Sequence, residues 1–299
     1  MNYYNEIRKQ LINNEITKKV KDYSKNKSDL ETYYNVGKLI IEAQGGEFRA
    51  KYGDGLIKEY SRKLTIEFGN GYSERSLKRM RKFYLYIKKG TPLATQLMWS
   101  HYIELLPIKD INEINYYIDI SIKQNLSRNE LRNRIKNNEY ERLDENTKNK
   151  LILKEKNIIT DFVKNPLIIK NMNNLEVVNE KILQKLILEN IPLFLRELGD
   201  GFSFISNEYK IKIGNSYNYI DLLLFNYIYN CFVVIELKVT ELKKEHIGQI
   251  EVYMNYIDRN IKSINQDNTI GIIICRKDNK FIMSYSSDKR VLSREFLLI

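Results

Sequence analysis

Two neighbouring apolar, strand-like segments in the second half of the chain each carry charged residues at their centres. Asp221 lies within the segment 217–225 (YNYIDLLLF), and Glu236 and Lys238 lie within the segment 231–240 (CFVVIELKVT). A charge in the middle of a buried strand is costly unless it is paired or bound to a metal ion. The sequence therefore predicts a sheet in which these three groups either pair with one another or line a functional site.

The spacing of these charges predicts how they face one another. Glu236 and Lys238 are two residues apart, so on a strand they point to the same face. A tight turn centred between Ile228 and Tyr229 pairs residues whose numbers sum to 457, and 221 plus 236 is 457. The sequence thus predicts an antiparallel hairpin with Asp221 opposite Glu236 and their Cβ atoms roughly 5 Å apart. A register slip of one residue would place the two carboxylates on opposite faces.

The facing carboxylates indicate a chemistry as well as a geometry. They repel each other unless a divalent cation lies between them, and a hard, oxygen-liganded ion such as Mg²⁺ suits such a pair. A cation held by carboxylates can activate water and stabilise charge on a phosphoryl oxygen, as phosphodiester hydrolysis requires. A nearby lysine can stabilise the same charge or position the water. The alternative is a structural Asp/Glu–Lys ion pair buried in a sheet, and the spacing alone leaves both interpretations open.

The hydrophobic pattern changes between the two halves of the chain. The first half has helical spacing, whereas the second half combines helices with short strand-like runs, which is typical of an α/β domain on a mixed sheet. Ser127 and Glu130 form a predicted capping box, and Pro192 predicts a kink. The predicted helices lie at 29–44, 55–68, 73–89, 99–106, 111–124, 127–137, 176–198 and about 242–258. The predicted strands lie at 204–213, 217–225, 231–240, 269–275 and 280–285.

A polar, charged segment at 144–157 (DENTKNKLILKEKN) is predicted as a linker between a helical domain, 1–143, and an α/β domain, 158–299. The net charge of +11 is uneven, with +9 in residues 1–150 and +2 in residues 151–299. This bias favours binding of a phosphate backbone by the first domain. The chain is also rich in Lys, Asn, Ile and Tyr, the pattern of an A/T-rich coding sequence, so net charge alone is a weak signal.

One predicted helix in the first domain has a basic face. Arg75, Lys78, Arg79 and Lys82 recur at spacings of three and four residues in SERSLKRMRKFY. Together with the helix before it and the FGNGY turn, this segment resembles a helix-turn-helix unit. Such a helix can lie in a DNA groove or along phosphates, so we expect a nucleic-acid-binding surface here. The alternative is a cationic face that contacts only solvent.

The composition excludes several other classes of protein. His101 and His246 are the only histidines, and Cys231 and Cys275 the only cysteines, so a His/Cys zinc site and a disulfide framework are not expected. The sequence contains no run of about 18 apolar residues and no apolar signal segment near its first residue. We therefore expect a cytoplasmic protein without a membrane-spanning segment, whose catalytic metal is held mainly by carboxylates.

The charged strand residues also carry a family resemblance. Tyr219–Ile220–Asp221, with Glu236–Leu237–Lys238 fifteen residues after the aspartate, resembles the PD-(D/E)XK nuclease signature. Longer stretches, FLRELGDGFSFISNEYKIKIG, YIDLLLF and CFVVIELKVTELKKEHIGQIEVYMNYI, are similar to the YhcG-like branch of that superfamily. The first half resembles that family's N-terminal domain in YYNVGKLIIEAQGG, YGDGLIKEYSRKLTIEFGNGYSERSLKRMRKFY, WSHYIELL and LSRNELRNRI. The chain departs at Ile220, where the signature has Pro but no chemistry depends on it, and at Leu126, where Trp is expected for packing.

The resemblance implies roles for the residues of the hairpin. It implies that Asp221 and Glu236 are metal ligands, with the backbone carbonyl of Leu237 as a third. It also implies that Lys238 is the catalytic lysine.

Further candidates lie on the helices beside the sheet. Gln249 and Tyr253 occupy the family's Q-x-x-x-Y positions and share a helix face. The glutamine is expected to orient the attacking water or a phosphate, whereas the tyrosine is either part of the site or core packing. The superfamily often adds an acid from its first helix, for which Glu189 is preferred over Glu180, although a helix glutamate is commonly only solvated.

The sequence as a whole predicts an α/β C-terminal PD-(D/E)XK restriction-endonuclease-like domain with a mostly α-helical N-terminal domain. We expect an endonuclease that depends on Mg²⁺ or Mn²⁺ and hydrolyses phosphodiester bonds of DNA, in defence, recombination or repair. The alternative is a DNA-binding or assembly protein whose nuclease fold does not cleave, against which the complete set of Asp221, Glu236 and Lys238 argues. An RNA substrate, sequence or strand preference and homo-oligomerisation are left open by the sequence.

Overall fold

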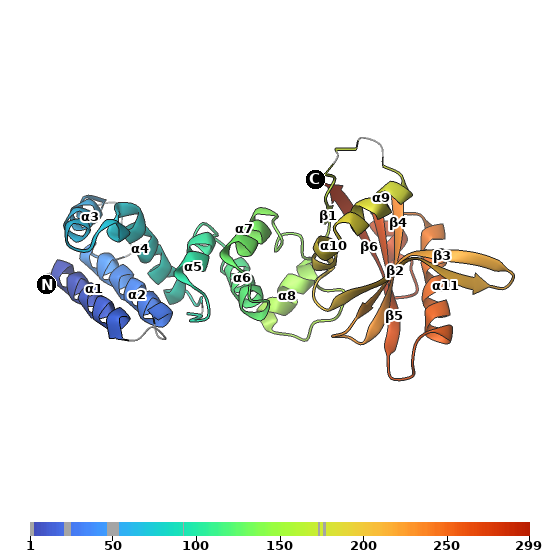
Figure 1. Cartoon of the computed structure of the whole chain (residues 1–299), viewed down its shortest axis with the longest axis horizontal. Helices are drawn as coiled ribbons and strands as arrows, with labels where there is room; N and C mark the ends of the chain where they lie inside the picture. The colour runs from blue at the N-terminus through green and yellow to red at the C-terminus, as the bar shows by residue number, and fades with distance from the viewer. Residues whose placement is uncertain (1–2, 21–24, 47–53, 92, 173, 176–177) are drawn as a thin grey trace. The chain divides into compact units, whose positions relative to one another are not determined.

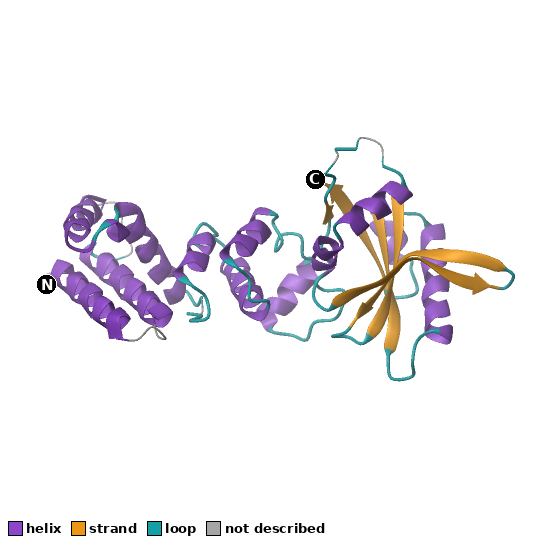
Figure 2. Cartoon of the chain, in the orientation of Figure 1, coloured by secondary structure: helices purple, strands orange, loops and turns teal. Residues whose placement is uncertain are grey.

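The computed structural model describes residues 3–20, 25–46, 54–91, 93–172, 174–175 and 178–299. The chain divides into two units, residues 1–140 and residues 141–299, and each is described by itself. Helices make up the described part of the first unit, while the strands lie in the second (Figure 2). Among the described residues, no helix is both long and apolar enough to cross a membrane.

The first unit is helical, as predicted. Its helices are α1 (Tyr3–Val20), α2 (Lys25–Ala43), α3 (Asp54–Phe68), the 3₁₀ turn η3 (Asn70–Tyr72), α4 (Glu74–Lys88), α5 (Trp99–Leu105), α6 (Ile111–Lys123) and α7 (Arg128–Lys136). The predicted capping box is confirmed, because the Ser127 hydroxyl accepts the Glu130 amide and the Glu130 carboxylate accepts the Ser127 amide. Ser73 caps α4 with a single hydrogen bond, in which its hydroxyl accepts the Ser76 amide.

A glycine in α2 allows α4 to pack closely against it. A Cβ atom added to Gly37 of α2 would lie 2.2 Å from the backbone oxygen of Met80 in α4, closer than any side chain tolerates. Met80, Leu77 and Ile40 are buried in the core shared by these helices. This close packing fixes the basic helix α4 in the unit.

The second unit is built on one six-stranded mixed sheet (Figure 1). Its elements are α8 (Glu145–Leu153), β1 (Leu167–Ile169), α9 (Glu180–Glu189), α10 (Ile191–Leu198), β2 (Phe202–Ile213), β3 (Ser216–Asn226), β4 (Cys231–Glu241), α11 (Lys244–Asn260), β5 (Asp267–Lys277), α12 (Lys280–Ser284) and β6 (Val291–Leu298). The strand order is β1-β6-β5-β4-β3-β2. The β2–β3 and β3–β4 pairs are antiparallel, while β4–β5, β5–β6 and β6–β1 are parallel.

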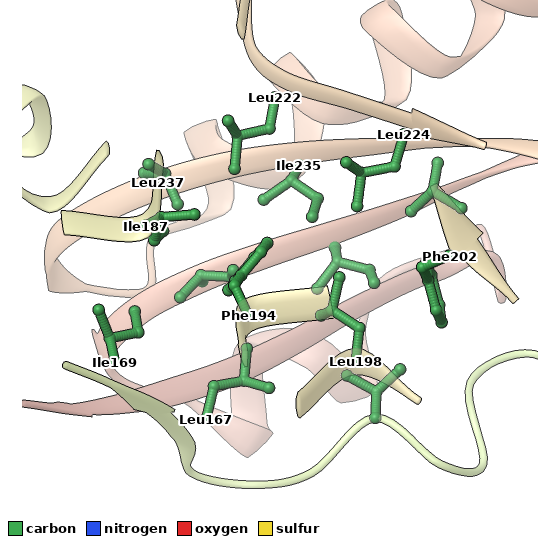
Figure 3. Packing of buried hydrophobic residues seen from close by; sticks show 14 of the residues in the cluster. Leu167, Ile169, Ile187, Phe194, Leu198, Phe202, Leu222, Leu224, Ile235 and Leu237 are labelled. Atoms are coloured by element: carbon green, nitrogen blue, oxygen red, sulfur yellow. The ribbon is translucent and has the colours of Figure 1, made fainter. Parts of the chain in front are cut away.

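Each face of the sheet buries a separate core. On one face, Leu222, Ile235 and Leu237 pack with Leu186 of α9 and Phe194 of α10, and Figure 3 shows the side chains of this cluster. On the other face, the sheet packs against α11, which connects the parallel strands β4 and β5 and contributes an apolar face of its own. Apolar side chains alternate between the two cores along β4, with Val233, Ile235 and Leu237 in the core beneath α9 and α10 and Val234 in the core beneath α11.

Three predictions about the ends of the second unit need correction. The segment 280–285, predicted as a strand, contains helix α12 (Lys280–Ser284) instead. The Asn279 side chain caps this helix by accepting the Ile282 amide, and a short apolar run does not distinguish strand from helix. Strands β1 and β6 were not predicted. The long helix predicted at 176–198 is two helices that part at Asn190, with Pro192 at the second position of α10, and its predicted start at 176 lies outside the described residues.

The segment 144–157 contains helix α8 and is tied into the second unit. The Thr147 hydroxyl donates to the backbone oxygen of Asp161 at 2.9 Å, and Lys150 forms an ion pair with the Asp161 carboxylate at 2.9 Å. Asp144 pairs with the buried Arg294 at 2.6 Å. The polar side chains that predict a linker therefore have partners in the tertiary structure, and the two units divide before this segment, between Tyr140 and Glu141.

Helix α11 approaches the sheet closely at Gly271 of β5, where an added Cβ would lie 2.5 Å from the Met254 sulfur and 3.0 Å from Ile250. We predict that Gly271→Val lowers the free energy of unfolding by about 1–3 kcal/mol, because overpacking a filled core forces side chains from their preferred rotamers. Urea denaturation followed by circular dichroism measures this change. The control is Gly248→Ala on α11, where an added Cβ meets nothing within 4 Å, and which should stabilise the helix by up to about 1 kcal/mol. Equal stability of the Gly271→Val variant and the parent chain would contradict the close approach.

Candidate active site

Asp221 lies at the point where the pairing between β3 and β4 ends. The paired residues are Leu222 with Ile235 through Asn226 with Cys231, so the predicted register, in which partner numbers sum to 457, is confirmed over this ladder. Beyond it, the Asp221 carboxylate accepts a hydrogen bond from the Leu237 backbone amide at 2.8 Å. A side chain here replaces the backbone ladder and fixes the carboxylate against β4.

The backbone around Asp221 is also irregular. Ile220 packs into the core beneath α11, whereas Leu222, two residues later, packs into the core beneath α9 and α10. Across from it on β2, Glu208 has a φ of 48°, a left-handed conformation that is uncommon for a residue other than glycine. The Gln184 side chain of α9 donates to the Asp221 backbone oxygen at 2.9 Å. Both the side chain and the main chain of Asp221 are therefore held in place.

Glu236 is a buried carboxylate with one oxygen unsatisfied. The residue is 1% exposed, and its Oε2 accepts a hydrogen bond from the Lys238 amine at 3.3 Å. Its Oε1 is buried without a hydrogen-bond partner. Burial, followed by the charge of Asp221, raises the pKa of Glu236 to about 8, and burial also raises the pKa of Asp221. The single positive charge of Lys238 therefore does not offset both carboxylates when they are ionised.

Lys238 links the sheet to the first turn of α9. Its amine lies 3.3 Å from Glu236 and 3.9 Å from the Glu180 carboxylate. The sequence-based preference for Glu189 over Glu180 is not supported by this placement. Glu189 is at the opposite end of α9 and pairs with Lys185 at 3.9 Å. At about 1.5 Å of rise per residue, the two glutamates are separated by most of the helix length.

Helix α11 contributes a third group of residues. The Gln249 amide donates to the Tyr253 hydroxyl at 3.0 Å. Tyr253 is buried, which raises its pKa, and the charges of Glu236, Lys238 and Asp221 also act on it. Both residues therefore lie beside the predicted site, as expected, and the tyrosine is part of the α11 core as well.

His246 is a residue of this region that the sequence reasoning did not assign. Burial, followed by the charge of Lys238, lowers its pKa, and its Nδ1 accepts the Lys243 amide at 3.1 Å. The signal that points to it is its position about one helical turn before Gln249, on a helix face shared with that residue.

The residues present fit a hard divalent cation held by few protein ligands. Among the described residues, no group of three or more His, Cys, Asp or Glu side chains is arranged to hold a metal ion. Mg²⁺, however, keeps most of its waters and commonly binds one or two carboxylates. Asp221 and Glu236 supply such a pair, and the unpartnered, buried Glu236 Oε1 is an acceptor in need of a positive partner. The carbonyl of Leu237, on the same strand, stays a predicted third ligand.

The predicted basic face lines a concave surface in the first unit. The pocket, of about 580 Å³, is lined by Glu74, Arg75, Lys78, Arg79, Lys82, Ile103, Leu106 and Pro107. All four predicted basic residues of α4 therefore converge on one hollow next to α5. Burial and the charge of Arg75 lower the pKa of Arg79, as expected where cations crowd together.

A neighbouring acid does not neutralise this surface. Glu104, next to Ile103 in the chain, binds Arg128 at 2.7 Å and Arg132 at 2.8 Å. These arginines lower the pKa of Glu104 to about 2, so the carboxylate is ionised but already paired. The arrangement favours an anionic partner.

Two family models match the two halves of the chain. The family model described as the YhcG PDDEXK nuclease domain matches residues 160–294, and the model described as the DUF1016 N-terminal domain matches residues 7–142. The YhcG protein of Escherichia coli (strain K12), provisionally named a nuclease, is 25% identical over 283 residues, covering 82% of this chain and 76% of that protein. The predicted fold class, a PD-(D/E)XK domain after a helical domain, is confirmed.

Two solved structures share weaker similarity. A repair endonuclease from Pyrococcus abyssi is 19% identical, with a TM-score of 0.29 over 41% of this chain and 48% of that one. A complex of EndoMS with double-stranded DNA is 18% identical, with a TM-score of 0.31 over 42% of this chain and 47% of that one. The chain spans about half the length of each, and TM-scores this low support no inference.

The raised pKa of Glu236 predicts how stability depends on pH. Protonated Glu236 stabilises the folded chain. This contribution is fully present below the ordinary carboxyl pKa of 4.5 and is lost as the pH rises through about 8. Without divalent cations, we expect the parent's free energy of unfolding to fall by a few kcal/mol across this window, since one pKa unit corresponds to about 1.4 kcal/mol. Glu236→Gln should lack this component and exceed the parent in stability near pH 9. Urea denaturation of both chains in a chelator from about pH 5 to about pH 9 provides the comparison. Parallel stability curves would be inconsistent with a buried, protonated Glu236.

Proposed function

Because the chain belongs to the YhcG-like family of PD-(D/E)XK nucleases, we propose that it is a metal-dependent endonuclease that hydrolyses phosphodiester bonds of DNA. The observation that carries the proposal is the buried Glu236 carboxylate, which lies beside Asp221 and has an oxygen without a hydrogen-bond partner. Such an acceptor is costly in a structural sheet, but it is what a cation-binding site requires.

The proposed roles follow from the positions of the side chains. Asp221, Glu236 and the Leu237 carbonyl would hold Mg²⁺ or Mn²⁺. When bound, the cation supplies activation of water and neutralisation of phosphoryl charge. Lys238 stabilises the negative charge that develops on the phosphoryl oxygens, and its contacts with Glu236 and Glu180 hold its amine at the site.

The helices supply positioning groups. Gln249 orients the attacking water or a phosphate, and its hydrogen bond to Tyr253 limits the conformations of its side chain. We propose Glu180, rather than Glu189, as the additional acid from the first helix, because it is the one near Lys238.

The alternative of a structural ion pair explains less. A Lys238–Glu236 pair uses only Oε2 of the glutamate and leaves Oε1 without a partner, while the single charge of Lys238 acts on both Glu236 and Asp221. A buried pair of this kind stabilises only when further hydrogen bonds satisfy the remaining atoms. We therefore do not propose a DNA-binding protein that does not cleave, and the cleavage assay described below would reveal one.

We further propose that the pocket on α4 and α5 binds the phosphate backbone of the substrate. Arg75, Lys78, Arg79 and Lys82 supply the cations, and phosphate contacts of this kind position a protein on nucleic acid without reading its sequence. The free, buried Cys231 and Cys275 fit a reducing cytoplasm, where such a nuclease would act in defence, recombination or repair.

The first test separates chemistry from metal binding. Asp221→Ala should abolish both cleavage and Mg²⁺ binding, because it removes one of two carboxylates from the site. Lys238→Ala should abolish cleavage but retain Mg²⁺ binding, because the lysine is not a ligand. Isothermal titration with Mg²⁺ and cleavage of supercoiled, linear, branched and single-stranded DNA measure the two properties. RNA substrates belong in the same assay, since cleavage of RNA alone would replace the proposed substrate.

Two further variants control this experiment. Glu180→Gln should lower the cleavage rate, whereas Glu189→Gln, at the other end of the same helix, should not. Equal activity of both variants would remove Glu180 from the site. A parent chain that never cleaves, together with a Lys238→Ala variant destabilised by roughly 3–5 kcal/mol and insensitive to Mg²⁺, would favour the structural ion pair.

The basic pocket generates a second test. Replacing Arg75, Lys78, Arg79 and Lys82 by Glu should weaken duplex DNA binding. It should also reduce the slope of the logarithm of the binding constant against the logarithm of the salt concentration, by about 0.9 for each phosphate that the variant no longer binds. Fluorescence anisotropy across a range of salt concentrations measures both effects. The matched control reverses four exposed cations elsewhere in the same unit, Lys9, Lys38, Lys58 and Arg62. If both quadruple variants lose affinity equally, the effect belongs to net charge and not to the pocket.

A further inference from the structure

The paired ends of β2 and β3 form a ribbon that projects from the rest of the sheet, beside α11 (Figure 1). Residues 209–220 of this ribbon (YKIKIGNSYNYI) include lysines and tyrosines but no acid. The proposed roles of the site residues do not use this segment, although it leads directly into Asp221.

The two faces of the ribbon differ in character. Ile211 and Ile220 are 1% and 0% exposed and pack into the core beneath α11. On the opposite face, Lys210 pairs across the strands with Tyr219, and Lys212 pairs with Tyr217. Tyr217 and Tyr219 are about half exposed, at 56% and 52%. The register therefore gathers two cations and two aromatic rings on one face that contacts solvent, defined here as the Lys–Tyr face.

The lysines of this face lie beside an aromatic ring. The Lys210 amine lies over the Tyr217 ring, 3.8 Å from its centroid, and the Lys212 amine lies 6.0 Å from the same centroid. Tyr219 is directly across the strands from Lys210, so each ring has a lysine as a neighbour. This is the combination with which proteins bind single-stranded nucleic acid, where bases stack on aromatic rings and cations contact the phosphates.

The Lys–Tyr face lies close to the candidate carboxylates along strands β2 and β3. Tyr219 is two residues before Asp221, and Glu208, just before the ribbon on β2, is close enough for its charge to raise the pKa of Asp221. A strand bound along this face would therefore lie close to the segment of β3 that leads into Asp221. The face is suited to unpaired bases, because a duplex offers only base edges in its grooves and not the flat faces on which rings stack.

We propose that the Lys–Tyr face binds an unpaired segment of the nucleic-acid substrate next to the scissile bond. Bases of that segment stack on Tyr217 and Tyr219, and Lys210 and Lys212 contact its phosphates. This inference rests on the proposed nuclease function for the position of the scissile bond, and it narrows the substrate to DNA with a single-stranded region.

The test measures binding of the full chain to a fluorescent oligothymidylate and to a duplex of equal length, in a chelator so that neither is cleaved. Combined Tyr217→Ser and Tyr219→Ser should weaken oligothymidylate binding roughly tenfold or more, because each stacked base contributes about 1–3 kcal/mol. Combined Tyr217→Phe and Tyr219→Phe should retain the parent affinity, since phenylalanine stacks as well. Lys210→Gln with Lys212→Gln should lower the log–log salt slope by about 0.7 for each phosphate that is no longer bound.

The control is Tyr227→Ser, which removes a 68% exposed tyrosine just beyond the other end of β3 and should leave affinity unchanged. Thermal melts of all variants establish that they fold. Unchanged oligothymidylate affinity in the double serine variant, an equal loss in the Tyr227→Ser control, or a loss confined to the duplex would each overturn the proposal.

The two proposals can fail separately. Tyrosine-dependent oligothymidylate binding by a chain that never cleaves would contradict the nuclease function and leave the binding surface intact. Cleavage that depends on Asp221, together with oligothymidylate binding that does not change in the tyrosine variants, would support the nuclease function and contradict the binding surface.

Discussion

The hydrogen bond between the Asp221 carboxylate and the Leu237 amide is the interaction on which the candidate site depends. It lies one residue beyond the last paired position of β3 and β4, so a side chain takes over where the backbone ladder stops. This hydrogen bond holds Asp221 beside Glu236, whose burial raises its pKa to about 8. Two carboxylates are thereby brought together in a sheet that would otherwise be apolar, and either a proton on Glu236 or a positive partner relieves the repulsion.

Elements on different sides of the sheet then converge on this pair. Glu180 comes from the first turn of α9, and Gln249 comes from α11, packed on the opposite face. Gly271 permits α11 to lie against β5 closely enough for Met254 and Ile250 to fill the space above it. The geometry of the site therefore depends on the packing of both cores. A substitution in either core would shift Glu180 of α9 or Gln249 of α11 relative to the carboxylates.

The ribbon and the basic pocket place positive charge in two different units of the chain. The pocket on α4 has four cations in its lining and no aromatic residue, although the Lys82 amine lies 5.4 Å from the centroid of the Tyr86 ring outside that lining. Such a set of cations suits the backbone of a duplex. The Lys–Tyr face offers rings as well as cations, which suits unpaired bases. The two sets of variants distinguish the contributions of these two surfaces to binding.

The sequence by itself determined the register of the β3–β4 hairpin from Leu222–Ile235 to Asn226–Cys231, because strand side chains alternate with a period of two and a tight turn leaves one pairing. It also determined the helical first unit, whose capping residues Ser73 and Ser127 act locally. Only the tertiary structure decided which glutamate of α9 reaches Lys238, since the sequence of a helix does not show how the helix is oriented across the sheet. It likewise decided the fates of α12 and β6, where short runs match either helix or strand, and the proximity of His246 to Lys238, because that depends on how α11 packs and not on any local pattern.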